Sequence, residues 1–283
     1  MSVVPEFEAY AAEIAVTEGF SAPVFCGKGA FKETYRVCRG SNPDIALKLI
    51  DLRKCSDVRV MREIDALRKC NSIRISKLLD TKTVKCSDGT DFAIVVEEYF
   101  AGGTLEDRIA AGIDNATKIG ICRGLALAIE ELQPLRLVHR DIKPANVMFR
   151  SASSADPVLV DFGLVRDLSQ ASETPSWLMQ GPGTPLYAAP EQLTNDKAMI
   201  DWRSDQFAVG VIVCLMLTGR HPYHEAGMSP ADVIAAVANR RGPSAWIQSQ
   251  LASSGLPSVT RALSPWPVGR FSNPKDFTQA LSL

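Results

Sequence analysis

Four polar residues in the middle of the chain have the types and spacing that phosphoryl transfer requires. Asp141, Lys143 and Asn146 lie in one short segment, and Asp161 follows further along the chain. A carboxylate can orient an attacking hydroxyl group, an ammonium group can neutralise a phosphate, and carboxylate and amide oxygens are suitable ligands for Mg²⁺. One loop could therefore supply the carboxylate, the cation and one metal ligand, and Asp161 could supply the second metal ligand.

These residues belong to three motifs that follow one another along the chain. The motifs are Val138-His139-Arg140-Asp141-Ile142-Lys143-Pro144-Ala145-Asn146, Asp161-Phe162-Gly163 and Ala189-Pro190-Glu191. In this order and spacing they resemble the signature of the eukaryotic-type (Hanks-type) Ser/Thr protein kinase family, which has bacterial members. The resemblance covers the chain from about Phe25 to Leu283.

The resemblance implies an ATP- and Mg²⁺-dependent kinase and gives each of the four polar residues a role. Asp141 is expected to be the catalytic base, Lys143 to neutralise the migrating phosphoryl group, and Asn146 and Asp161 to ligate Mg²⁺. A lysine two residues after the catalytic Asp resembles Ser/Thr-specific rather than Tyr-specific members. The expected substrates are ATP and proteins that present Ser or Thr hydroxyl groups.

A glycine-rich segment near the N-terminus resembles the phosphate-binding loop of the same family. Gly27-Lys28-Gly29-Ala30-Phe31 lies where that loop begins, while Lys32 and Thr34 replace its third glycine and its valine. Glycines allow backbone N–H groups to approach phosphate oxygens without interference from a Cβ atom. The resemblance also implies that Lys48 pairs with the α- and β-phosphates and that Glu63 holds Lys48.

The segment after the last predicted strand of the first half resembles the family's connection between its two lobes. The backbone of Glu98 and Phe100 is expected to hydrogen-bond the adenine edge. Glu97 departs from the family, which usually has an apolar residue or Thr at the back of the adenine pocket. Because a buried unpaired carboxylate is costly, Glu97 must find a cation or a hydroxyl group, or else this strand is shifted by one residue.

Two further contacts are expected to fix the large lobe. Glu191 is predicted to form a buried ion pair with Arg270. Asp205 is predicted to brace the catalytic loop, and it could also cap the helix that begins near it. Both expectations come from the order of these residues in the chain relative to the family pattern.

The polar stretch between the second and third motifs resembles an activation segment. Thr174 and Ser176 are the positions where a phosphate is expected, and Arg140 is expected to bind that phosphate. The resemblance therefore predicts autophosphorylation of this segment.

The elements that must position these residues differ between the two halves of the chain. The clearest patterns are strands at 45–50 and 92–96 and helices at 6–18, 60–68, 116–132 and 207–217. We predict an α+β, two-lobed protein kinase fold. Its small lobe, 25–100, would be an antiparallel β-sheet with one main helix, and its large lobe, 101–283, would be mostly helical. An N-terminal helical extension, 1–24, would precede them.

Composition limits the remaining possibilities. With a net charge of −1, the chain has no general attraction to nucleic acid or to a membrane surface. Seven cysteines without a C-x-x-C pair indicate free thiols in a reducing compartment. The N-terminus has no signal-peptide pattern, and the longest apolar run, Phe207–Leu217, is too short to span a bilayer. We therefore expect a cytoplasmic protein with no nucleic-acid or membrane partner.

Two alternative functions remain open at this point. Lys32, Thr34 and Glu97 would suit a pseudokinase that acts as a binding or scaffold module, although every expected catalytic residue is present. A small-molecule kinase of the aminoglycoside type shares the Asp and Asn of the catalytic loop. That group usually lacks the equivalent of Lys143 and the Ala-Pro-Glu segment.

Overall fold

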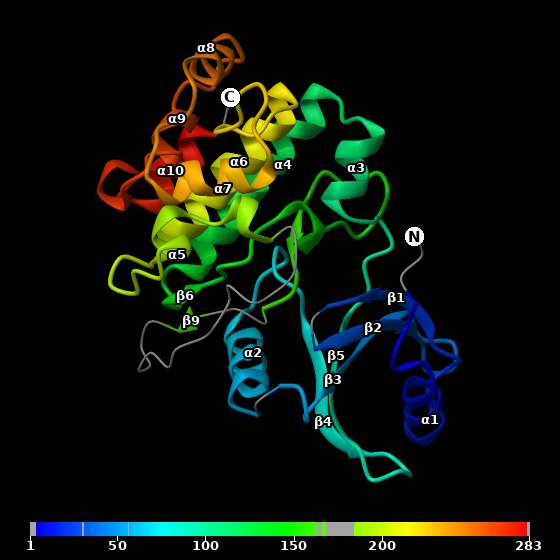
Figure 1. Cartoon of the computed structure of the whole chain (residues 1–283). Helices are drawn as coiled ribbons and strands as arrows, with labels where there is room; N and C mark the ends of the chain where they lie inside the picture. Colours follow the sequence, from blue (N-terminus) through cyan, green and yellow to red (C-terminus); the bar gives the residue numbers. More distant parts are fainter. Residues whose placement is uncertain (1–3, 30, 56, 163–165, 168–183, 282–283) are drawn as a thin grey trace. The chain divides into compact units, whose positions relative to one another are not determined.

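A computed structural model describes most of the chain, namely residues 4–29, 31–55, 57–162, 166–167 and 184–281. The chain divides into two compact units, Met1–Phe100 (unit 1) and Ala101–Leu283 (unit 2). Unit 1 is built on one β-sheet and unit 2 is mainly helical (Figure 1), so the predicted α+β class is confirmed.

A five-stranded antiparallel sheet forms the centre of unit 1 (Figure 1). Its strands are β1 (Val24–Lys28), β2 (Lys32–Val37), β3 (Ile45–Asp51), β4 (Leu78–Lys85) and β5 (Asp91–Glu98). Their order across the sheet is β1-β2-β3-β5-β4, and every neighbouring pair is antiparallel. The two predicted strands are confirmed within β3 and β5.

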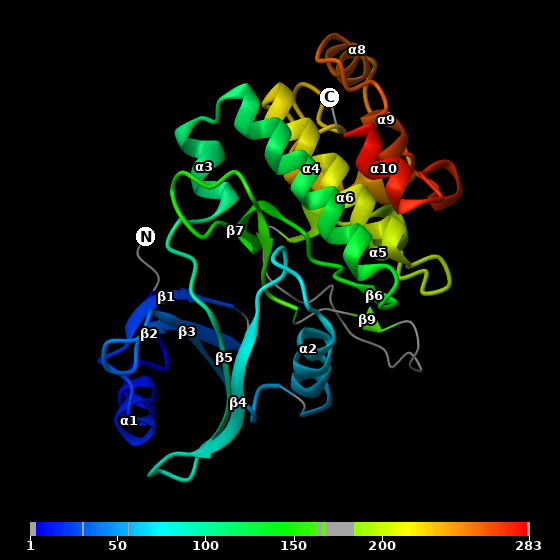
Figure 2. The same ribbon diagram turned by 180° about the vertical axis from the view of Figure 1, so that it is seen from behind.

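Two helices cover opposite faces of this sheet, α1 (Glu8–Glu18) and α2 (Asp57–Lys69) (Figures 1 and 2). Successive side chains of a strand point to opposite faces. The odd-numbered β3 residues Leu47 and Leu49 therefore pack in the α1 cluster, while Ile50 packs in the α2 cluster with Val60 and Ile64. Both faces of β5 are covered in this way, which explains why its interior is buried on both sides.

Helix α1 is part of the core of unit 1. Phe7, Ala11 and Ile14 are buried against the sheet, and the Phe7 ring meets the Phe92 ring edge-on at 5.2 Å. The helix predicted at 6–18 is confirmed as Glu8–Glu18, and Gly19 after it takes the left-handed conformation at φ 70° that ends many helices. The residues we predicted as a separate extension thus pack as the second helical layer of the small unit.

Unit 2 is built around two long helices. Its helices are α3 (Leu105–Ala111), α4 (Asn115–Leu132), α5 (Pro190–Leu193), α6 (Trp202–Thr218), α7 (Pro230–Ala238), α8 (Ala245–Ser253), α9 (Val259–Ala262) and α10 (Pro274–Ala280). Unit 2 also has two short antiparallel strand pairs. β6 (Leu137–Val138) pairs with β9 (Arg166–Asp167), and β7 (Val147–Met148) pairs with β8 (Val158–Leu159). The predicted long helices are confirmed within α4 and α6.

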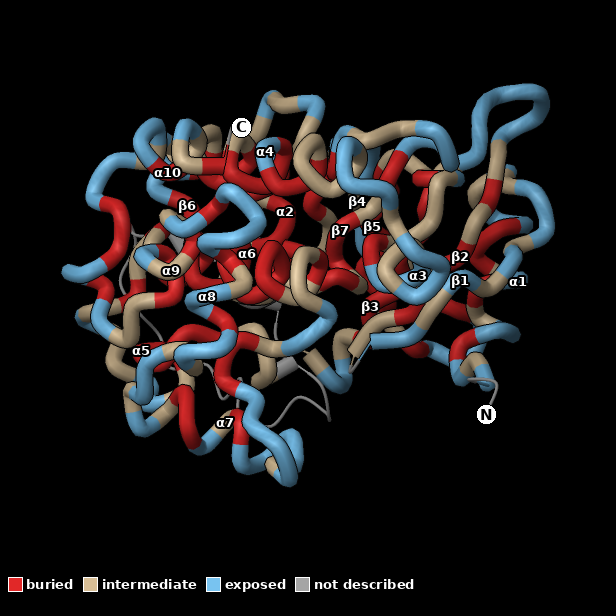
Figure 3. Tube along the Cα trace, turned by 90° about the horizontal axis from the view of Figure 1, so that it is seen from above, coloured by how far each residue is buried: buried red, intermediate tan, exposed pale blue. Residues whose placement is uncertain are grey.

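Helix α6 is buried along almost all of its length (Figure 3), where it packs against α4, α8 and α9. This explains the long apolar run that begins at Phe207. None of the described helices is long and apolar enough to cross a membrane. All seven cysteines lie in the described part of the chain and are free thiols, as predicted.

Candidate active site

A cluster of charged side chains lies on the α2 face of the sheet in unit 1. Strand alternation places Lys32, Lys48 and Glu97 on this face, and Glu63 reaches it from α2. Lys48 Nζ lies 4.0 Å from Glu63 Oε1, which brings together the pair predicted from the sequence. Lys32 Nζ lies closer to the same carboxylate oxygen, at 3.1 Å. Glu63 is therefore shared by two ammonium groups.

Glu97 is the other carboxylate of this cluster. It is 1% exposed, and it accepts a short hydrogen bond from Lys48 Nζ and one of 2.5 Å from Ser76 Oγ. The β3–β5 register runs without interruption from Ile45 opposite Glu98 to Asp51 opposite Phe92. Of the two alternatives from the sequence, the structure thus supports a paired carboxylate, since Glu97 has both a cation and a hydroxyl group.

The described residues of the glycine-rich segment lie at the end of β1 and directly before β2. Gly29 N–H donates to Lys32 O at 2.7 Å, and a bulge lies in β1 between Phe25 and Gly27. The Lys28 ammonium group pairs with Glu6 at 2.8 Å and with Glu33 at 3.5 Å. These pairs connect the predicted phosphate loop to the N-terminal segment of unit 1.

Other members of the predicted nucleotide site are placed as follows. Phe31 O accepts a hydrogen bond from Asp51 N–H at 3.3 Å. The Glu98 N–H donates to Lys77 O at 3.2 Å, and Phe100 is buried. Ala30 lies outside the described residues.

In unit 2, three of the predicted site residues are joined through Asp141, which accepts hydrogen bonds from Lys143 and Asn146. Lys143 Nζ donates to Asp141 Oδ2 at 3.0 Å. Asn146 Nδ2 donates to the same oxygen and to the Asp141 carbonyl, both at 2.9 Å. Because its amide nitrogen serves Asp141, the Asn146 side chain retains its oxygen, Oδ1, as the atom that can ligate a cation.

The Asp141 carboxyl group is largely removed from water. Burial raises its pKa, and the nearby Asp161 carboxylate adds to this effect, whereas the Lys143 charge and the bonds from Lys143 and Asn146 oppose it. Both directions follow from ordinary electrostatics, since desolvation disfavours the charged form and a neighbouring cation favours it. Asp141 and Asp161 are thus close enough to interact within unit 2.

Asp205 braces the catalytic loop, as predicted. Its two carboxylate oxygens accept the N–H groups of His139 and Arg140, each at 2.8 Å. Burial raises the pKa of Asp205 to about 7, and these two backbone bonds act in the opposite direction. The cap of α6 is a different residue, because Asp201 accepts from Arg203 N–H. The prediction that Asp205 could cap this helix was therefore wrong.

Two residues of the motifs have an unusual backbone conformation. Arg140 has φ 69° and Asp161 has φ 66°, in the region that side chains other than glycine seldom adopt. The Arg140 N–H is held by its hydrogen bond to Asp205. Next to these two residues in the chain, the His139 ring packs edge-on against the Phe162 ring, with ring centroids 4.7 Å apart. Such conformations cost energy and persist where the surroundings fix them, often at functional sites.

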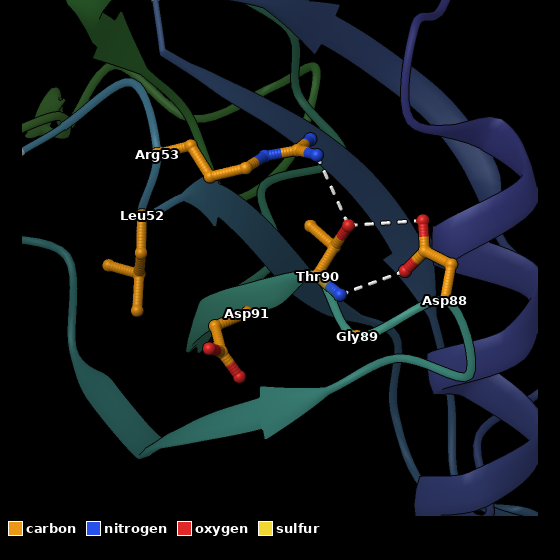
Figure 4. Close-up of a pocket in the computed structure, with 6 residues that line it drawn as sticks. All are labelled: Leu52, Arg53, Asp88, Gly89, Thr90 and Asp91. Atoms are coloured by element: carbon orange, nitrogen blue, oxygen red, sulfur yellow. Dashed lines mark hydrogen bonds between the residues drawn. The ribbon is translucent and has the colours of Figure 1, made fainter.

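A pocket of about 400 Å³ lies at the β4–β5 turn (Figure 4), and none of the residues that line it belongs to the charged cluster. Three of the residues that line it, Arg53, Asp88 and Thr90, are joined by hydrogen bonds. Arg53 binds the Thr90 hydroxyl at 3.2 Å, and Asp88 accepts from both the N–H and the hydroxyl group of Thr90. Asp51 holds the other side of the Arg53 guanidinium. We interpret this network as a brace for the turn.

The predicted phosphorylation positions Thr174 and Ser176 lie outside the described residues.

Comparison with known proteins gives the chain's relationships. A sequence model of the protein kinase domain matches residues 21–256. Serine/threonine-protein kinase PknF of Mycobacterium tuberculosis is 29% identical to the chain, over 95% of the chain and 57% of that protein. PknL of Mycobacterium bovis is 31% identical over 63% of the chain and 44% of its own length. Probable serine/threonine-protein kinase MARK-C of Dictyostelium discoideum is 33% identical to the chain, over 73% of the chain and 26% of its own length. The chain spans about half the length of the bacterial relatives it matches, and less of the third.

Proposed function

The chain belongs to the protein kinase family, and on that premise we propose that it transfers the γ-phosphoryl group of Mg-ATP to Ser or Thr hydroxyls of proteins. The relatives named above as Ser/Thr kinases support the Ser/Thr class. The observation that supports the chemistry most directly is the bonded set of Asp141, Lys143 and Asn146.

In this proposal unit 2 carries the catalytic groups. Asp141 accepts or orients the proton of the substrate hydroxyl, and its raised pKa makes it a stronger base than an exposed Asp. Lys143 keeps one side of the Asp141 carboxylate in place and neutralises the transferred phosphoryl group. Asp205 fixes the backbone before Asp141, so that the carboxylate is held in position before the substrate binds.

The donor set in unit 2 fits Mg²⁺. Asn146 Oδ1 and the Asp161 carboxylate would hold the ion, which usually binds proteins through one or two such oxygens together with substrate phosphates. When bound, Mg²⁺ neutralises charge on the phosphate oxygens.

Unit 1 contributes the groups that hold the nucleotide. Backbone N–H groups of residues 27–31 would approach the phosphates, and Lys48 would pair with the α- and β-phosphates. The adenine edge would meet the Phe100 N–H and the Glu98 carbonyl, because the Glu98 N–H is used by Lys77.

The test of this function is transfer of label from γ-labelled ATP to a protein rich in Ser and Thr, with Mg²⁺ present. Asp161→Asn is the matched inactive variant. Asparagine tolerates a positive φ, so this change removes a charged metal ligand without adding backbone strain. We expect loss of label with the variant, and with wild type after chelation of Mg²⁺. Equal labelling by both proteins would disprove the assignment, whereas Mg-ATP binding without transfer by wild type would support a pseudokinase.

We further propose that the enzyme phosphorylates its own activation segment at Thr174 or Ser176. A phosphate adds about −1.5 to −2 charges, which the Arg140 guanidinium can bind in a bidentate manner. Mass spectrometry of the active enzyme should find phosphate at one of these residues. The double alanine variant should lose activity, and full activity in that variant would contradict the proposal.

The free cysteines support a reducing, cytoplasmic location for this activity. Cell fractionation with an antibody to the chain would test it.

A further inference from the structure

Among the described residues, the charged cluster of unit 1 is buried and carries equal numbers of positive and negative groups. It consists of two ammonium groups and two carboxylates, and their side chains are 15% (Lys32), 8% (Lys48), 4% (Glu63) and 2% (Glu97) exposed. Buried charges are tolerated when they are paired and hydrogen-bonded. Removal of any one of the four therefore leaves an excess charge in a region with little water.

The sheet register explains why Lys48 meets Glu97. Lys48 lies opposite Val95 on the neighbouring strand β5, and Glu97 lies two residues beyond Val95 on the same face. Diagonal neighbours of this kind are within reach of long side chains. Glu97 is also fixed from its other side, because Ser76 Oγ donates to its second oxygen.

Glu63 holds Lys48 less closely than Glu97 does. The distance from Lys48 Nζ to Glu63 Oε1 is 4.0 Å, which is an ion pair without a hydrogen bond, whereas Glu97 Oε1 accepts a short hydrogen bond. Lys32 lies nearer to Glu63 than Lys48 does, and so contributes to neutralising the Glu63 carboxylate.

We propose that Glu97 is the principal positioning residue for Lys48, a role that it shares with Glu63, while Lys32 balances the charge of Glu63. An ammonium group has three N–H donors. One N–H of Lys48 donates to Glu97, a second is attracted by the Glu63 carboxylate, and the third is directed to a nucleotide phosphate. This inference rests on the proposed function, because it assigns to Lys48 the task of phosphate binding.

The test compares how adenosine and ADP bind to the wild-type protein and to Glu97→Gln. Glutamine keeps the size of the side chain and an acceptor for Ser76, and it removes the charge that holds Lys48. Because a hydrogen bond to a charged group is worth about ten-fold or more in an equilibrium constant, we expect ADP affinity to fall at least about ten-fold. Adenosine has no phosphate, so its affinity should stay unchanged. Calorimetric titration measures both.

Three further variants make the test specific: Asp51→Asn, Lys48→Met, and Lys48→Met combined with Glu97→Gln. Asp51→Asn is the matched control, since Asp51, on β3, is a fully buried carboxylate like Glu97 but binds Arg53. We expect Asp51→Asn to bind ADP as wild type does. In a Lys48→Met background, Glu97→Gln should cause no further loss of ADP affinity, because Glu97 acts through Lys48.

Three results would overturn this inference. They are unchanged ADP affinity in Glu97→Gln, an equal loss of adenosine and ADP affinity, and an additional ADP loss in the Lys48→Met background. The second result would mean that Glu97 lines the base pocket. Failure of the proposed function gives a different outcome, in which the wild-type protein itself binds no ADP or transfers no phosphate.

Discussion

Arg270 and Glu191, which lie 79 residues apart in the sequence, form a fully buried, bidentate ion pair. Arg270 Nη1 donates to Glu191 Oε1 at 2.6 Å and Nη2 donates to Oε2 at 2.9 Å, and neither side chain has exposed surface. Two further N–H groups of the guanidinium, on Nη1 and Nε, donate to the carbonyls of Arg203 and Ser264. The pair predicted from the order of the sequence is thus confirmed, and it ties the end of the third motif to the C-terminal part of unit 2.

We predict that Arg270→Met lowers the free energy of unfolding by about 3–5 kcal/mol, because it leaves the Glu191 carboxylate buried without its cation. Urea unfolding followed by circular dichroism measures this change. Arg203→Met provides the control. Arg203 pairs with Asp201 in a partly exposed position, and such a pair contributes about 1 kcal/mol or less. Similar losses in the two variants would contradict the importance of the buried pair.

A second prediction concerns the catalytic base. Asp141→Asn should lower kcat by about 100-fold to 10,000-fold, which is the usual contribution of a general base. The affinity for Mg-ATP should change little, since Asp141 is expected to touch the substrate hydroxyl rather than the nucleotide. Steady-state kinetics and calorimetric titration of Mg-ATP give the two quantities. A loss of nucleotide affinity in proportion to the loss of rate would argue against this role.

Much of the large unit could be predicted from the sequence. The first motif indicated Asp141, Lys143 and Asn146 as one group, and in the structure Lys143 and Asn146 both donate hydrogen bonds to Asp141. Long helices with continuous apolar faces were equally clear, since α6 is buried against three other helices. Such features depend on local spacing, which the sequence displays directly.

Contacts that depend on strand register were harder to predict. The sequence raised the question of what Glu97 binds, but the answer needed the β3–β5 register and the position of Ser76, which precedes β4 without any distinctive pattern. The second partner of Glu63, Lys32, is of a residue type that is mostly exposed to solvent. Strand β2 instead directs it to the α2 face.

The packing of α1 against the sheet could not be predicted from the sequence pattern either. Its buried side chains include two alanines, so it has no strong apolar stripe. Its docking relies on Phe7 and on the buried Glu33 carboxylate, which accepts the N–H groups of Glu6 and Phe7. Neither residue signals a helix–sheet contact by its spacing alone.

We therefore predict that Phe7→Ala destabilises the protein by about 3 kcal/mol, the usual cost of removing a buried aromatic side chain. Phe7 is 3% exposed and packs on Phe92. Val16→Ala is the control on the same helix, because Val16 is 82% exposed and its truncation should change stability by less than about 0.5 kcal/mol. Thermal and urea unfolding would show the difference. Equal stability of Phe7→Ala and wild type would mean that α1 does not contribute to the core.

The last prediction concerns His221, which is held in its neutral form. Its Nε2 donates to Leu186 O at 2.8 Å, and its Nδ1 accepts from Tyr223 N–H at 3.3 Å, so one ring nitrogen must carry a proton and the other must not. Burial lowers the pKa of His221 from 6.5 to about 4, and the charge of nearby His224 acts in the same direction, while the bond to Leu186 opposes it.

This depressed pKa makes stability depend on pH. Between pH 6.5 and about 4 the unfolded chain binds a proton at His221 that the folded chain does not, so this contribution is present above pH 6.5 and is lost as the pH falls. The loss amounts to at most about 3 kcal/mol. His221→Gln keeps a donor for Leu186 but does not titrate. Its free energy of unfolding, measured in urea from pH 7.5 to 4, should therefore fall less steeply than that of wild type. The exposed His224 provides the control, because His224→Gln should follow the wild-type slope closely. Parallel curves for wild type and His221→Gln would show that His221 is not held neutral.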